Sequence, residues 1–155
     1  MNLLNYVLIE AVCFSGILLG GLLALLAPEE IRPGKKYLEI VQTATLGCIL
    51  VLTLYSFLPS PLTPIFFSPP IIYLILKYRL TDMKYYPLLA LTNIKTANPL
   101  FITLAALIFF YGFPTGSLAV NLSDKRWHVQ IMRIFQQNYL FLLLGVGSYF
   151  LKYFL

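Results

Sequence analysis

The stretch from Leu46 to Leu58 reads LGCILVLTLYSFL and carries no charged side chain on any side of a helix. A helix buried in a soluble protein keeps a polar outer face, and this stretch has none. The stretch lies in a run of 37 uncharged residues between Glu39 and Lys77. Because about 20 apolar residues span a hydrocarbon layer about 30 Å thick, the run predicts at least one membrane helix. Four uncharged runs of 18, 37, 28 and 18 residues divide the chain, between Glu10 and Glu29, Glu39 and Lys77, Lys95 and Asp124, and Arg133 and Lys152.

The overall composition agrees with this interpretation. The chain has 155 residues, of which 59% are hydrophobic and 11% are charged, whereas a soluble domain is about 25% charged. A chain of this size buries only about 70% of its unfolded surface, too little to hide so much apolar area from water. The composition therefore excludes an ordinary soluble domain, a disordered segment and a disulfide scaffold. No ten-residue alternation typical of barrel strands occurs, so helices must satisfy the backbone within the bilayer.

We predict an all-α, polytopic membrane protein with a single membrane domain. The first apolar segment has no Lys or Arg in residues 1–9, so we interpret it as a permanent span and not a signal peptide. The third segment is short or broken by Pro69 and Pro70, and is either a kinked span or a re-entrant half-helix. Pro33 and Gly34 predict a turn between the first two helices, and Pro99 is expected to kink the fourth. The five predicted helices cover about residues 5–27, 37–58, 62–78, 87–113 and 131–155.

The distribution of Lys and Arg predicts an orientation. With the N-terminus outside and the C-terminus cytoplasmic, eight basic residues lie inside and three outside, as the positive-inside rule requires. If the third segment does not cross, the split becomes four inside and seven outside. The excess of basic residues is thus a topology signal. Nucleic-acid binding would need a clustered basic face, which the sequence does not show, so we expect no nucleic acid as a partner. The expected location is a membrane, the plasma membrane if the source is prokaryotic.

Two charged residues do not fit the predicted loops. Glu10 lies five to seven residues inside the first helix, and Lys95 about eight residues inside the fourth. An ionisable side chain within a membrane segment is a functional hypothesis by default. We expect Glu10 and Lys95 to act as ion-relay residues or to form a buried pair, if the two helices pack together. The alternatives are that Glu10 reaches interfacial water and that Lys95 extends to the cytoplasmic interface.

Polar residues around Lys95 predict a stripe on the fourth helix. Their spacing of three, four, seven and eleven residues places most of them on one helix face, and such a stripe must face other helices or a water-filled cavity. Pro99 frees a carbonyl within it, as in the broken helices of transporters. The predicted polar face consists of Thr92, Asn93, Thr96, Asn98, Pro99 and Thr103.

Other features indicate packing and anchoring. Gly16, Gly20 and Ala24 recur every four residues, which lets a second helix approach closely, from this chain or another. The single Trp and the single His lie together in residues 126–128, which is typical of an interface anchor. The anchor residues are Arg126, Trp127 and His128.

No catalytic motif, metal-ligand spacing or cofactor-binding motif occurs, so we expect no metal or cofactor and favour a protein that is not an enzyme. The leading hypothesis is a non-catalytic or ion-conducting subunit of a larger membrane complex, in its most concrete form a proton- or sodium-coupled energy-converting one. The second is a small homo-oligomeric transporter or channel, and the third an interfacial lipid-modifying enzyme that uses His128 or Asp82. The expected partners are the lipid bilayer and either other membrane subunits or further copies of the chain.

Overall fold

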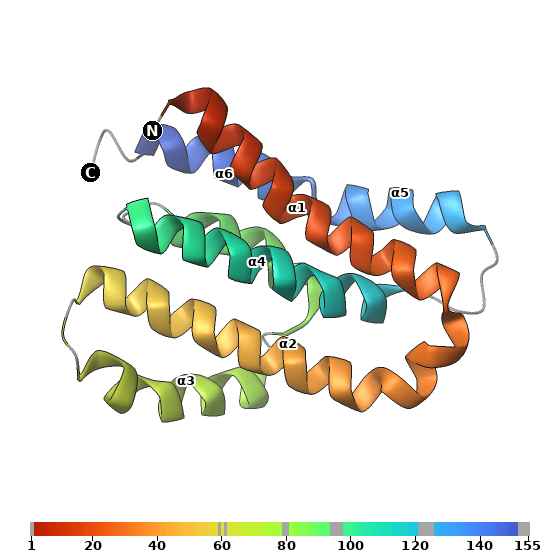
Figure 1. The fold of residues 1–155 in the computed structure, drawn as a ribbon, viewed down its shortest axis with the longest axis horizontal. Coiled ribbons are helices and arrows are strands. Elements are labelled where there is room, and N and C mark those ends of the chain that lie inside the picture. Colours follow the sequence, from red (N-terminus) through yellow and green to blue (C-terminus); the bar gives the residue numbers. More distant parts are fainter. Residues whose placement is uncertain are drawn as a thin grey trace.

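The computed structural model describes residues 2–58, 60, 62–78, 81–93, 98–120 and 126–151, without the side chains of residues 63–65, 84, 93, 98 and 99. Within these ranges the chain contains six α-helices, one 3-10 helix and no strand (Figure 1). The all-α prediction is confirmed. The elements are α1 (Leu3–Leu26), α2 (Pro28–Phe57), α3 (Thr63–Tyr78), η1 (Met83–Asn93), α4 (Asn98–Ala119), α5 (Trp127–Asn138) and α6 (Leu140–Leu151).

Three helices are long and apolar enough to cross a membrane. They are α1 with 24 residues, α2 with 30 residues, and the 20 residues Leu100–Ala119 of α4. At 1.5 Å per residue, each reaches across a hydrocarbon layer of about 30 Å. The chain is therefore a candidate multi-pass membrane protein, as the uncharged runs predicted.

The second helix begins earlier than the predicted residue 37. It starts at Pro28 and continues through Pro33 and Gly34, where the sequence suggested a turn. Pro28 occupies the first turn, where a missing N–H costs nothing. Glu29 and Glu30 follow in the same turn, and their negative charges favour a helix N-terminus. The polar first third of α2 is thus helical, and most of its residues are exposed.

The predicted helix over residues 87–113 differs most from the structure. Residues Met83–Asn93 form the 3-10 helix η1, and a separate α-helix begins at Asn98. Pro99 is the second residue of α4, a first-turn position that proline tolerates. It therefore belongs to a helix start and does not kink a continuing helix.

The predicted final helix is also divided, and the third is continuous. The break falls at Tyr139, between the amphipathic α5 and the apolar α6. By contrast, α3 remains helical through Pro69 and Pro70. Its 16 residues rise only about 24 Å. It is a short helix, as predicted, but the two prolines do not break it.

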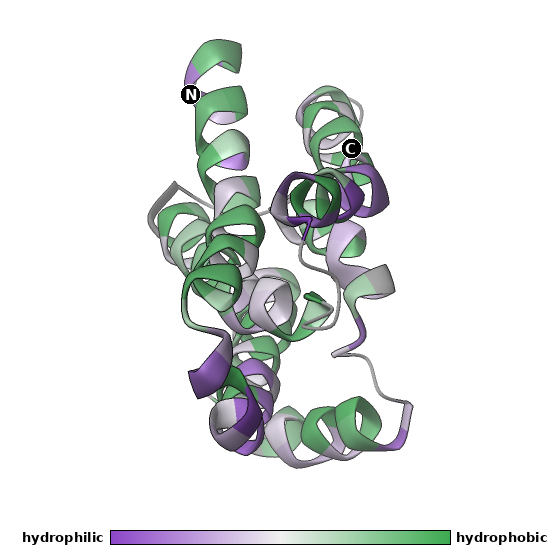
Figure 2. Ribbon diagram, turned by 90° about the vertical axis from the view of Figure 1, so that its right-hand side faces the viewer, coloured by the Kyte–Doolittle hydropathy of each residue, from purple (hydrophilic) through white to green (hydrophobic). Residues whose placement is uncertain are grey.

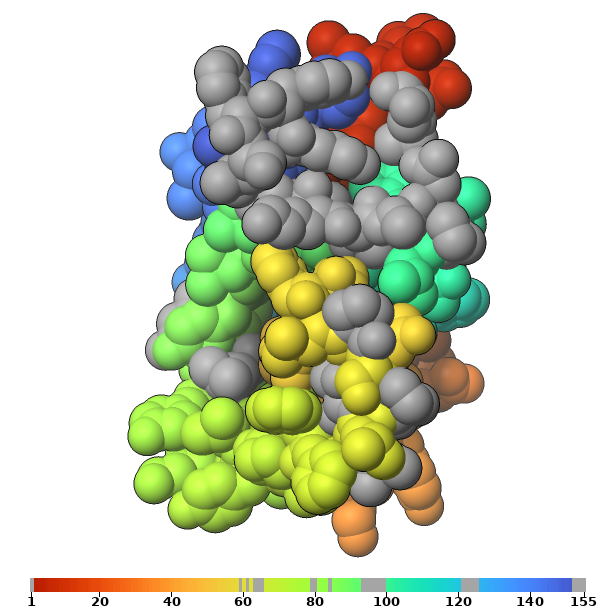
Figure 3. All heavy atoms as spheres, turned by 90° about the vertical axis from the view of Figure 1, so that its left-hand side faces the viewer, coloured from red at the N-terminus to blue at the C-terminus, as the bar shows by residue number. Residues whose placement is uncertain are grey.

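The helices form a bundle with α4 at its centre. One face of α4 packs against α1 and the other against α2, while α3 packs against α2, and η1 against α6. Viewed from the end that holds the start of α1, the α2–α3 hairpin stands at one side of the molecule and α1 and α6 at the other (Figure 3). The start of α1 and the end of α6 lie at the same end (Figure 1). The predicted number of spans and the predicted orientation stay predictions.

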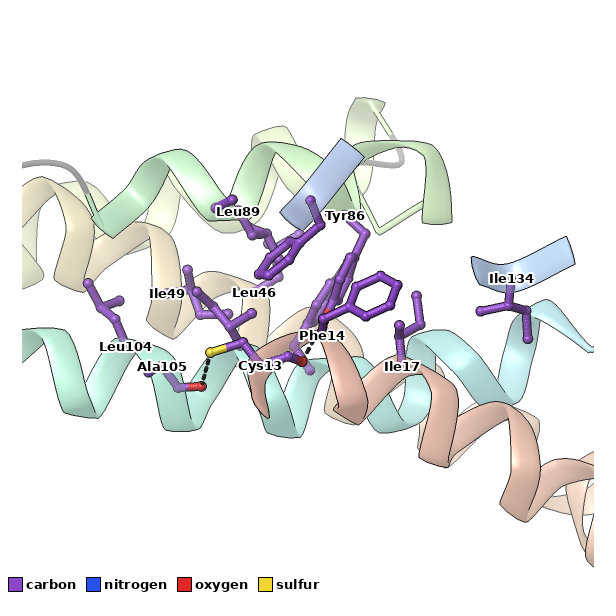
Figure 4. Packing of buried hydrophobic residues seen from close by; sticks show 14 of the residues in the cluster. Cys13, Phe14, Ile17, Leu46, Ile49, Tyr86, Leu89, Leu104, Ala105 and Ile134 are labelled. Atoms are coloured by element: carbon purple, nitrogen blue, oxygen red, sulfur yellow. Dashed lines mark hydrogen bonds between the residues drawn. The ribbon is translucent and has the colours of Figure 1, made fainter. Parts of the chain in front are cut away.

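The core lies where α1, α4, α2, η1 and α6 meet. Cys13, Tyr86 and Phe141, from three of these elements, are fully buried. The Cys13 thiol donates to the Ala105 carbonyl oxygen at 3.3 Å, and the Tyr86 hydroxyl donates to the Cys13 carbonyl oxygen at 2.9 Å (Figure 4). These bonds link the backbones of α1 and α4 to η1 deep in the bundle.

Glycines from two helices form the crossing of α1 and α4. Gly16 and Gly20 of α1 lie directly against the backbone of α4, and Gly112 and Gly116 lie against that of α1. A Cβ atom on Gly112 would lie 2.5 Å from the Ile17 nitrogen and 2.6 Å from the Gly16 carbonyl carbon. The neighbour of the small-residue stripe is thus a helix of the same chain. Close backbone approach between small residues is a common way to pack membrane helices.

Candidate functional site: a polar pocket at the charged end

A polar pocket of about 630 Å³ opens at the end of the bundle where α1 passes into α2. Figure 2 views this end and shows hydrophilic segments of α2 and α5 facing outward. Four parts of the chain meet at the pocket: the first half of α2, the end of α3, the segment that starts η1, and the end of α4. Its polar lining consists of Lys35, Glu39, Gln42, Thr43, Thr81, Asp82 and Thr115.

The floor of the pocket is a closed set of hydrogen bonds around Gln42. The Gln42 side chain, only 5% exposed, donates through Nε2 to the Thr81 carbonyl oxygen at 2.8 Å and to Thr115 Oγ1 at 3.0 Å. Thr115 in turn donates to the Tyr111 carbonyl oxygen at 2.7 Å, and the Tyr111 hydroxyl donates to the Thr81 carbonyl oxygen at 3.4 Å. These bonds tie α2, the segment before η1 and α4 together, which gives the pocket a fixed base.

The rim of the pocket carries charges in contact with water. Lys35 Nζ lies 3.8 Å from Glu39 Oε1, one helix turn away, with the two side chains 66% and 55% exposed. Such an exposed pair contributes at most about 1 kcal/mol, so either partner can turn to a ligand at little cost. Asp82, in the segment before η1, also lines the pocket and is exposed. The pocket therefore combines one ammonium group, two carboxylates and several hydroxyl and amide groups.

The early start of α2 brings Lys35 into the pocket wall. Lys35 lies on a helical turn, one turn before Glu39, because the helix begins at Pro28 instead of at residue 37. The side chains of residues 35, 39, 42 and 43 follow spacings of three, four and seven, so they share one face of α2. That face is turned toward the end of α4 by the Gln42–Thr115 bond.

Glu10 lies elsewhere, within the bundle between α1 and α6. Its side chain is 1% exposed, and a Cβ atom on Gly145 would lie 3.1 Å from Glu10 Oε2. One turn earlier on α1, the Tyr6 hydroxyl shares a 2.5 Å hydrogen bond with Ser148 Oγ of α6. The absent side chain of Gly145 makes the room that the carboxyl occupies. Lys95 lies outside the described residues, so the predicted pair with Glu10 stays a prediction.

The predicted polar stripe is divided between two elements. Thr92 and Asn93 lie at the end of η1, while Asn98, Pro99 and Thr103 lie in α4. Thr92 Oγ1 donates to the Leu89 carbonyl oxygen at 2.7 Å, and Thr103 is exposed. Thr96 lies outside the described residues. The residues do not share a face of one continuous helix.

The predicted anchor residues lie at the start of α5. Arg126, Trp127 and His128 are all exposed, and the Trp127 and His128 rings meet edge to face at 5.8 Å. Within the described ranges, no group of three or more His, Cys, Asp or Glu side chains could hold a metal ion.

Sequence reasoning missed Gln42 and Thr115, the two buried polar residues of the pocket floor. One available signal was a polar amide within the apolar helix predicted over residues 37–58. Its partner was not readable, because Gln42 and Thr115 are 73 residues apart. Comparisons with protein-family models, with curated proteins and with solved structures find no match to this chain.

Proposed function

We propose that the chain crosses the bilayer six times, with the pocket end in the cytoplasm. The crossings are α1, α2, α3, η1, α4 and the α5–α6 pair, whose directions alternate along the bundle (Figure 1). The 11 residues of η1 rise about 22 Å. Backbone that is not α-helical is tolerated at membrane depth where protein encloses it, and η1 is packed against α6 and α4.

Charge asymmetry supports this orientation. In the sequence, nine of the eleven Lys and Arg residues fall in or beside the connections between α1 and α2, α3 and η1, and α4 and α5, whereas Lys95 and Lys152 follow η1 and α6. Nine basic residues on one side and two on the other is a stronger asymmetry than the eight and three of the five-span prediction. Because basic residues are retained on the cytoplasmic side, the pocket end is assigned to the cytoplasm. Both ends of the described chain then face away from the cytoplasm.

Cysteine labelling tests the orientation. In a Cys48→Ser background, which keeps only the buried Cys13, Gly34→Cys should react with a membrane-impermeant maleimide only after cells are permeabilised, whereas Asn2→Cys should react on intact cells. A Cβ atom at Gly34 meets nothing within 4 Å, so this substitution does not disturb packing. Labelling of Gly34→Cys on intact cells would exclude the proposed orientation.

We infer that the protein binds a small polar or amphiphilic ligand from the cytoplasmic side. The observation that carries this inference is the pocket itself: about 630 Å³ lies in the usual range of about 300–1,000 Å³ for ligand sites. Fixed polar groups at its base and charged groups at its rim supply the means of recognition. The hydrogen-bonded floor supports a site that is open at one end, and not a channel.

A substitution that fills the pocket tests this function. Ala119 lines the pocket at the end of α4, so Ala119→Trp should deplete a compound that co-purifies with the wild-type protein in mild detergent. Ala106→Trp is the matched control, because Ala106 is an exposed residue of the same helix that does not line the pocket. Identical small-molecule and lipid profiles, measured by mass spectrometry for all three proteins, would refute a ligand-binding pocket.

As a second candidate, we propose that the chain is a subunit of a larger membrane complex. The supporting observation is α3, which packs chiefly against α2 and leaves apolar side chains such as Phe66 and Leu76 more than 60% exposed. Intact mass spectrometry from mild detergent should then detect foreign subunits in fixed ratio. A pure oligomer of this chain would favour the transporter hypothesis instead. A proton- or sodium-coupled role for such a complex depends on Glu10 and predicts loss of coupling in Glu10→Gln.

A further inference from the structure

An apolar groove of about 960 Å³ adjoins the polar pocket along the α2–α3 hairpin, and Leu107 of α4 also lines it. It runs along α2 from Lys36 to Leu52 and is closed on one side by residues of α3 such as Ile72. The 16-residue distance corresponds to about 24 Å of helix, more than one leaflet of a hydrocarbon layer about 30 Å thick. The groove is therefore long enough to follow an acyl chain from the interface past the bilayer midplane.

The groove and the polar pocket share part of their walls. Glu39, Thr43 and Leu76 line both cavities. Lys35 lines the pocket and its neighbour Lys36 lines the groove, so both cavities open at the charged end of the bundle. A polar site that continues into an apolar groove at this level fits one molecule with a polar head and an apolar tail.

We propose that the two cavities together bind a bilayer phospholipid with an ethanolamine headgroup, its acyl chain in the groove and its headgroup in the pocket. This proposal rests on the ligand-binding function proposed for the pocket, and it names the class of ligand.

The charged residues that line the two cavities favour this headgroup over the other common ones. Lys35 in the pocket and Lys36 in the groove supply two positive charges, and Glu39, which lines both, and Asp82 in the pocket supply two negative ones. A balanced set suits a zwitterion better than a purely anionic headgroup. An ethanolamine ammonium has N–H donors for carboxylates and hydroxyl groups, whereas a choline group has none. The phosphate then lies toward Lys36 and the ammonium toward Glu39 and Asp82.

The test uses the full chain reconstituted in phosphatidylcholine vesicles that contain phosphatidylethanolamine with a photoreactive acyl chain. After irradiation, mass spectrometry of peptides should place the adducts on groove residues, Cys48, Val51 and Ser68 among them. Unlabelled phosphatidylethanolamine should compete severalfold better than phosphatidylglycerol or phosphatidylcholine. Adducts spread evenly over the apolar exteriors of α1, α3 and α4, or equal competition by phosphatidylglycerol, would overturn the proposal.

A substitution in the groove makes the test specific. Ala44 is exposed and lines the groove, so Ala44→Trp should remove most groove adducts without disturbing the core. Val41→Trp is the control, because Val41 is 51% exposed on the same helix and does not line the groove. Cys48→Trp, also at an exposed groove residue, is a second blocking variant if the first fails to fold. Adducts that persist in a folded blocking variant contradict the groove site.

The two proposals fail in different ways. If Ala119→Trp releases a water-soluble compound while photolabelling never maps to the groove, the pocket function stands and the phospholipid assignment is wrong. If Ala119→Trp changes neither the co-purified compounds nor the preference for the ethanolamine headgroup, the pocket holds no headgroup and both proposals are wrong.

Discussion

Replacing Gly112 with alanine should weaken the crossing of α1 and α4. The new Cβ atom would lie 2.5 Å from the Ile17 nitrogen and 3.0 Å from the Gly16 Cα atom. All the atoms in its way belong to the backbone of α1, so no side chain can rotate to make room. Overpacking typically costs about 1–3 kcal/mol, and a backbone clash should lie near the upper value, about 3 kcal/mol.

The effect is measurable as a change in melting temperature. For a chain of this size, 1 kcal/mol corresponds to about 2–4 °C, so Gly112→Ala should melt about 6–12 °C below the wild type. The assay is thermal unfolding in detergent, followed by fluorescence-detected size-exclusion chromatography. Expression should fall in parallel, because part of the population would lose its packed core.

Gly147 provides the matched control. It lies in α6, and a Cβ atom there would meet nothing within 4 Å. Alanine in a helix interior is favoured over glycine by about 0.5–1 kcal/mol, so Gly147→Ala should melt at or slightly above the wild-type temperature. If Gly112→Ala and Gly147→Ala melt together, α1 and α4 do not make the close approach described here.

Two further substitutions test the buried polar groups. Gln42→Leu leaves the Thr81 carbonyl without its 2.8 Å donor and should cost about 1–3 kcal/mol in thermal unfolding; a stability equal to that of the wild type would mean that the pocket floor is not held by Gln42. Gly145→Ala places a Cβ atom 3.1 Å from Glu10 Oε2 and should be destabilising only while Glu10 is present. A double-mutant cycle with Glu10→Ala should therefore give a coupling of about 0.5–3 kcal/mol, and additive effects would contradict the contact.

The apolar runs allowed the class of fold to be predicted, because a charged residue is costly at membrane depth and each long run must form a helix there. Helix boundaries were less predictable. Pro33 and Pro99 suggested a turn and a kink, but Pro33 lies inside α2 and Pro99 in the first turn of α4. A proline removes one donor wherever it occurs, and neighbouring contacts decide whether the helix ends there.

Polar residues within the helices were also only partly predictable from the sequence. The sequence singled out Glu10, which lies outside the pocket, since any carboxyl in an apolar helix is conspicuous. It could not identify Gln42 or Thr115 as a pair, because a lone amide or hydroxyl in a helix gains significance only from its partner. That partner is supplied by a helix 73 residues away.

The sequence by itself determined that this chain is helical and a candidate membrane protein, and most of its charged residues lie in a few connections. Both properties follow from the composition of single segments, because the apolar length of a segment decides whether it can span a bilayer and its charged residues favour the connections. Only the tertiary structure decided that the stripe of Gly16 and Gly20 lies against α4, and that the first turns of α2 meet the end of α4 around a polar pocket. These features depend on which helix becomes the neighbour of which. Within a bilayer that choice is made by close packing and hydrogen bonds between distant segments, not by hydrophobicity, which all the apolar helices share.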